Sequence, residues 1–163
     1  MFRRQLLGVV VAGCCCLAAA AWGQPTEAAL SASLRAHVQG ERFGIVTSIR
    51  GLPLGVRDEL QRLFASGALD IAEPGAGFQA TGAKVDPGLP LRRLVSAGCS
   101  TDHCLVYYER GGTAHTWHAA LFHWTPDATR LEVGGVAPPA MASIDDLRGA
   151  ILAGRIKGGA KVW

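Results

Sequence analysis

The stretch from Leu91 to Val136 constrains the fold more than any other part of the chain. Apolar and polar side chains alternate along it, and three turn sequences interrupt it, at Cys99–Cys104, at Gly111-Gly112 and near Pro126-Asp127. Alternation with a period of two residues is typical of strands that bury one face. The stretch therefore predicts an antiparallel four-stranded β-meander over about residues 91–136.

The turns also set the register of this predicted sheet. Taken together, they predict six cross-strand pairs: Ala97 with Val106, Val95 with Tyr108, Tyr108 with His115, Val106 with Trp117, Leu121 with Val133, and His123 with Leu131. In this register one face is largely apolar and forms the predicted core face. A slip of one residue would exchange the two faces, so the agreement between the turns supports the register.

The opposite face mixes polar side chains with large apolar ones. Five of its residues would form an aromatic and cationic patch: Tyr107, His118, Phe122, Trp124 and Arg130. Aromatic and arginine side chains are enriched at recognition surfaces, so an uncovered patch predicts a binding surface. The alternative is that the first helix or the loop from Ile71 to Pro90 covers it.

Three segments have the apolar spacing of amphipathic helices, at about residues 27–39, 55–66 and 144–153. Thr26 is the expected N-cap of the first and Ser143 marks the start of the third. We expect all three helices to pack on the apolar face of the meander, which predicts an α+β fold. Phe43 to Ile49 is a possible short strand.

The first 23 residues resemble a secretory signal peptide. Arg3-Arg4 is a basic start, Leu6 to Ala21 is apolar, and a small-x-small tripeptide ends at Gly23. Cleavage before Gln24 would leave residues 24–163 as a single α+β domain in the periplasm. The alternatives are a membrane anchor, twin-arginine export, secretion beyond the cell, or a lipoprotein anchored through Cys14.

Charge and cysteine content narrow the possible partners. The net charge is +3, and loss of Arg3 and Arg4 with the signal lowers it to +1. No dense basic stripe remains, so a nucleic-acid partner is not expected, and no second apolar run suggests a transmembrane segment in the mature chain. Cys99 and Cys104 are the cysteines left after cleavage, and an oxidising compartment predicts a disulfide between them.

Four histidines near the two cysteines raise the question of a metal site: His103, His115, His118 and His123. On strands, the expected geometry sends His115 and His118 to opposite faces and separates His115 from His123 by about 26 Å. A disulfide between the two cysteines would also leave neither thiolate available as a metal ligand. The sequence therefore predicts no metal and no cofactor.

The chain lacks a nucleophile elbow, a phosphate-binding loop and a dinucleotide fingerprint, so no catalytic residues are predicted. The leading interpretation is a non-enzymatic periplasmic binding or interaction module, whose partner is a periplasmic protein or a small ligand. The alternative is a small periplasmic hydrolase with its site between loop 71–90 and the sheet.

The stretch Val106 to Gly112, continued by His115 to His118, resembles the centre of a group of small exported proteins of GC-rich proteobacteria. The resemblance implies an exported location. It implies no activity and no functional residues.

Overall fold

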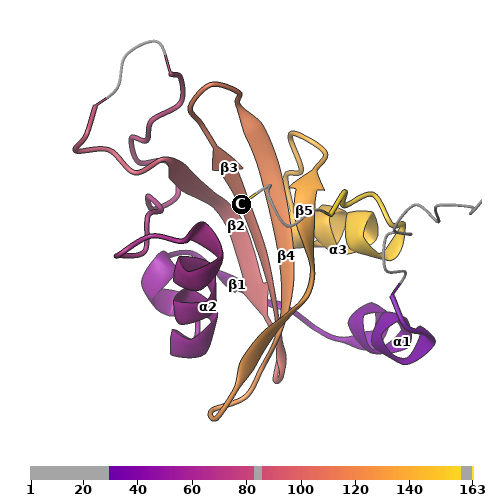
Figure 1. Cartoon of the computed structure of the whole chain (residues 1–163). Helices are drawn as coiled ribbons and strands as arrows, with labels where there is room; N and C mark the ends of the chain where they lie inside the picture. The colour runs from indigo at the N-terminus through magenta and orange to yellow at the C-terminus, as the bar shows by residue number, and fades with distance from the viewer. Residues whose placement is uncertain (1–29, 83–85, 159–162) are drawn as a thin grey trace, which may run out of the picture.

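The structure, a computed structural model, describes residues 30–82, 86–158 and 163 (Figure 1). Its elements follow in the order α1 (Ala32–Gly40), β1 (Gly44–Val46), the 3-10 helix η1 (Ile49–Gly51), α2 (Leu54–Phe64), β2 (Arg92–Cys99), β3 (His103–Arg110), β4 (Thr116–Trp124), β5 (Thr129–Ala137) and α3 (Ile144–Leu152). The predicted α+β class is confirmed. The predicted signal peptide and Thr26 lie outside the described residues.

The sheet has five antiparallel strands in the order β1-β2-β3-β4-β5, not the four that the sequence predicts. The additional strand is β1, whose Gly44 pairs with Cys99 and whose Val46 pairs with Ala97. A strand of three residues is too short to show alternation, so its pairing partner was not predictable from its own sequence. Within the described residues, no helix has the length and apolar content needed to span a bilayer.

The expectation that all helices pack on one face is wrong, because helices cover both faces of the sheet (Figure 1). On one face, α2 buries Val56 and Leu60 in a cluster that includes Leu94 and Val106. On the other face, α1 and α3 contribute to a second apolar cluster, whose sheet residues include Leu105. Every residue of β3 from His103 to Glu109 is buried, so its two faces cannot be told apart by polarity.

The second and third helices begin and end close to the predicted residues. The first begins at Ala32 instead of near residue 27. The first helix starts at Ala32 because the Ser31 side chain accepts a hydrogen bond from the Leu34 backbone N–H at 3.1 Å. The third starts with a capping box, in which Ser143 and Asp146 each accept a hydrogen bond from the other's backbone N–H.

The predicted register is correct only in part. The pairs Ala97 with Val106 and Leu121 with Val133 are confirmed. The other four are wrong: Tyr108 lies opposite Leu94 and His118, Val106 lies opposite Ala120, and His123 lies opposite Arg130. Two β-bulges and one loop explain these shifts. The bulges leave Val95 and Glu132 without direct partners, and Gly111 to His115 form a longer loop than a two-residue turn.

Cys99 and Cys104 form the predicted disulfide. They lie directly opposite each other where β2 turns into β3. The bond therefore holds the turn that carries Asp102 and leads into His103.

Burial on both faces predicts that truncation on either face destabilises the fold. We expect Leu94→Ala, on the α2 face, and Leu105→Ala, on the α1 and α3 face, each to cost about 2 to 5 kcal/mol. Val95→Ala is the matched control, because the bulge leaves this side chain 37% exposed. It should cost about 0.5 kcal/mol or less. Denaturant unfolding of the three variants measures this, and a mild Leu105→Ala would contradict the two-faced core.

Candidate functional site

The aromatic patch predicted from the sequence is not an exposed surface. Tyr107 is fully buried in the cluster beneath α1 and α3, and its hydroxyl donates to the Pro138 carbonyl at 2.9 Å. His118 and Phe122 are buried on the opposite face, and Trp124 is partly buried there. Only Arg130 extends into solvent, where it pairs with Glu132. The prediction fails because the register shift turns β4 over and because helices cover both faces.

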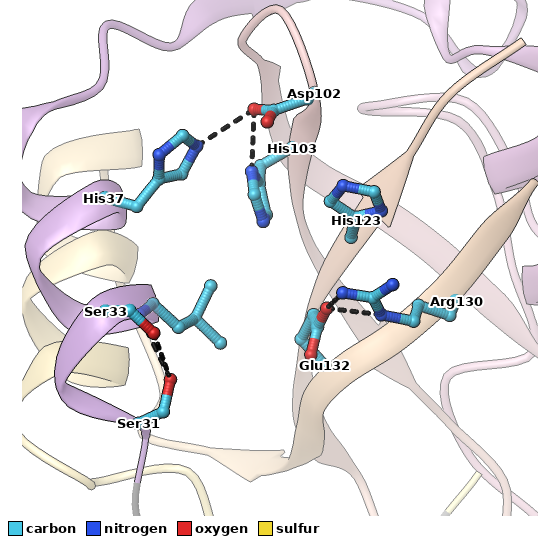
Figure 2. A pocket seen from close by; sticks show the side chains of 9 residues that line it. Ser31, Ser33, His37, Asp102, His103, His123, Arg130 and Glu132 are labelled. Atoms are coloured by element: carbon cyan, nitrogen blue, oxygen red, sulfur yellow. Dashed lines mark hydrogen bonds and ion pairs between the residues drawn. The ribbon is translucent and has the colours of Figure 1, made fainter.

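A different group of polar side chains converges where α1 meets the β2–β3 turn (Figure 2). The group consists of His37, Glu41, Asp102 and His103, and we call it the His–carboxylate cluster. It borders a pocket of about 340 Å³ whose lining also includes His123, Arg130 and Glu132. Figure 2 shows the His37 imidazole and the His103 imidazole both directed to the Asp102 carboxylate.

Local structure explains why these side chains meet. His37 and Glu41 are four residues apart at the end of α1, so they lie on the same side of the helix. Asp102 and His103 belong to the turn that the disulfide closes, and the Ser100 hydroxyl accepts a hydrogen bond from the His103 backbone N–H at 3.1 Å. His123 lies directly opposite His103 in the β3–β4 register.

Asp102 is the centre of the cluster. Its Oδ1 lies 3.0 Å from His37 Nε2 and 2.8 Å from His103 Nδ1. Glu41 Oε1 lies 3.2 Å from the same His37 nitrogen. The rings of His103 and His123 are 5.1 Å apart between centroids, so a third imidazole borders the cluster.

The electrostatics of the cluster follow from these contacts. The hydrogen bond that His37 donates to the Asp102 carboxylate raises the pKa of His37, with a smaller opposing effect of burial. Burial acts to raise the pKa of Asp102, but hydrogen bonds from His37 and His103 together outweigh it and lower that pKa. Glu41 Oε2 is buried and has no hydrogen-bond partner. Among the described residues, the two carboxylates form ion pairs only with histidines.

This arrangement is able to bind a metal ion. The four donor atoms all lie within 4.8 Å of one another. Ligand atoms held at about 2 Å from a tetrahedral ion lie about 3.3 Å apart, so small side-chain rotations would suffice. Two imidazoles with two carboxylates form a nitrogen and oxygen donor set, which suits divalent transition metals such as zinc.

The metal site weighed from the sequence comprised His103, His115, His118 and His123, and only His103 of these belongs to the cluster. His115 instead contacts Glu109 at 2.7 Å, and His118 is buried beside Tyr108. His37 was not considered because it lies far from the others in sequence. The signal that was available is the spacing of His37 and Glu41, which suits two ligands on one helix face.

The place suggested for a hydrolase site, between loop 71–90 and the sheet, carries a different arrangement. Glu109 is 7% exposed and accepts hydrogen bonds from Arg93 Nε and His115 Nε2, both at 2.7 Å. In the part of the chain that the structure describes, no hydroxyl or thiol is hydrogen-bonded to the His115 ring. A nucleophile paired with this histidine is therefore missing there.

Comparison with known proteins finds no matching family model, no matching curated protein and no matching solved structure. The function must therefore be inferred from the chain's own residues.

The contact with Asp102 should be visible in the titration of His37. In the metal-free protein we expect the pKa of His37 above the ordinary value of 6.5, and Asp102→Asn should move it back toward that value. Because the pKa of His37 is raised, the charged pair stabilises the fold below pH 6.5 for as long as Asp102 stays ionised, and this contribution is lost as pH rises through the His37 pKa. Proton NMR of the ring C–H resonances measures both proteins. An unchanged His37 titration in Asp102→Asn would contradict the contact.

Proposed function

We propose that this protein is an exported, non-enzymatic binding protein that takes up a divalent transition-metal ion, with zinc as the representative case. The observation that carries the proposal is the convergence of His37, Glu41, Asp102 and His103 within 4.8 Å. The cluster would hold the ion through imidazole nitrogens and carboxylate oxygens.

The number of donors favours binding over catalysis. Catalytic zinc sites commonly use three protein ligands and keep a position open for water or substrate. Here four side chains converge, which is enough to fill a tetrahedral shell. Among the described residues, no serine, threonine or cysteine side chain is hydrogen-bonded to the imidazole ring of His37 or His103, as a nucleophile would be; Ser100 bonds only the backbone of His103.

Exposure favours an ion that exchanges with solvent. The side chains of His37 and Asp102 are 40% and 35% exposed, whereas His103 is nearly buried. The nearly buried His103 imidazole would be a ligand with a fixed position. The exposed side chains of His37 and Asp102 would let the ion reach the site from solution. This combination suits reversible capture better than a permanently enclosed structural ion.

The signal-like N-terminus and the disulfide support the exported location. An exported protein meets metal ions outside the cytoplasm. Near neutral pH, neutral imidazoles and ionised carboxylates are both available as ligands. The proposed partner is therefore a small inorganic ion.

Zinc binding to the purified, metal-stripped protein tests the proposal. The protein must carry no histidine tag and must keep its disulfide, and isothermal titration calorimetry measures the affinity. We expect one zinc ion per chain. His37→Ala and Asp102→Ala should each weaken binding at least about tenfold, because each removes a ligand.

His115→Ala is the matched control, because its side chain is 38% exposed and also contacts a carboxylate. It should leave zinc affinity unchanged. Thermal melts of the metal-free variants show whether each one folds. Absence of saturable zinc binding, or equal losses in His115→Ala and His37→Ala, would disprove the proposed site.

A further inference from the structure

Two arginines face each other at the far end of β3 from the His–carboxylate cluster. Arg92 on β2 and Arg110 on β3 are a direct cross-strand pair, so both side chains lie on the same face of the sheet. Tyr108 precedes Arg110 by two residues on that face, and His118 lies opposite Tyr108. We call these four residues the Arg–Tyr–His cluster.

The cluster has more positive than negative charge. Arg92 donates to Asp70 Oδ2 at 2.7 Å, and the second oxygen of Asp70 accepts from the Leu91 backbone N–H. Arg110 forms no ion pair with any residue that the structure describes. Like charges directly opposite each other are destabilising. The Asp70 carboxylate balances the charge of one guanidinium group and leaves that of the other without a counter-charge.

The same cluster contains buried polar atoms without partners. They are Arg92 Nε, Arg110 Nε, the Tyr108 hydroxyl and His118 Nδ1. Three of the side chains are almost completely enclosed, with exposed fractions of 4% for Arg92, 0% for Tyr108 and 1% for His118. Buried polar groups are normally hydrogen-bonded, so the unpartnered donors of Arg92, Tyr108 and Arg110, which share one face of neighbouring strands, point to an acceptor among them.

The surroundings of Arg92, Tyr108 and His118 fix their orientation and charge, and the His118 ring is already hydrogen-bonded to the Thr116 hydroxyl at 2.9 Å. The Arg92 guanidinium lies over the Phe64 ring at 4.0 Å, which fixes its orientation. The Tyr108 hydroxyl lies beside the Arg92 guanidinium. Burial raises the pKa of Tyr108, so the hydroxyl keeps its proton. Burial, together with the two arginines, lowers the pKa of His118 to about 4, so its ring is neutral and adds no charge.

We propose that the Arg–Tyr–His cluster binds a small tetrahedral oxyanion of the phosphate or sulfate type. Its oxygens would accept hydrogen bonds from Arg92, Arg110 and Tyr108, and its charge would compensate the second guanidinium. Arg110 is only partly buried, so the anion would enter past this side chain at the end of the strands. The site is separate from the metal cluster, since the seven residue steps along the strand from His103 to Arg110 span about 23 Å.

Anion titrations of the metal-free protein test this proposal. Inorganic phosphate, sulfate and acetate are added at constant ionic strength, which removes differences in general screening. Thermal unfolding and isothermal titration calorimetry report binding. We expect saturable stabilisation by phosphate or sulfate and a weaker effect of acetate, because a planar carboxylate offers fewer acceptor oxygens.

Two variants locate the site. Tyr108→Phe removes one hydroxyl, and Arg110→Gln removes the arginine without a carboxylate partner, so each should weaken anion binding at least about fivefold. Arg155→Gln is the control, since Arg155 is exposed and lies outside the cluster. Zinc binding by Tyr108→Phe should equal that of the unaltered protein, which separates this test from that of the metal site.

Three outcomes would overturn the proposal. Absence of saturable binding by every anion would mean that water alone satisfies the buried donors. Equal weakening by Arg155→Gln would mean general charge attraction. Unchanged anion affinity in Tyr108→Phe and in Arg110→Gln, with both variants folded, would place binding elsewhere.

Discussion

Burial of β3 on both faces is the constraint on which the rest of the structure depends. Leu105 and Tyr107 point into the cluster beneath α1 and α3, while Val106 and Tyr108 point into the cluster beneath α2. Such a strand is stable only with neighbours on both edges and helices over both faces, because each face removes apolar area from water. The placement of β2, β4 and all three helices follows from this requirement.

The apolar middle of β3 confines its polar chemistry to the strand ends. At one end, the disulfide-closed turn presents Asp102 and His103 to His37 of α1. At the other end, Arg110 faces Arg92 above the buried Tyr108. Buried charges need partners in a low-dielectric interior, and the two ends meet this need differently. Histidines and carboxylates compensate one another at the first end, whereas the second has an excess of guanidinium groups.

Local patterns were sufficient for the second and third helices, for the span of the meander and for the disulfide. The stripe of Val56 and Leu60, the capping residue Ser143 and the turn between the cysteines each act over a few residues, so sequence alone reveals them. The register was accessible in this way only for the pairs Ala97 with Val106 and Leu121 with Val133. The bulge at Val95 breaks the regular count, and the loop from Gly111 to His115 is longer than its two glycines suggest.

The sequence by itself determined the α+β class, the β-meander and the cysteine pairing, because these depend on periodicity and on short loops. Only the tertiary structure decided which faces are covered and which polar side chains meet. Tyr107 and Phe122 became core because helices lie over both faces. His37 and Asp102 became neighbours across 65 residues because α1 packs beside the β2–β3 turn. Contacts over such separations depend on packing of the whole sheet, which no local pattern encodes.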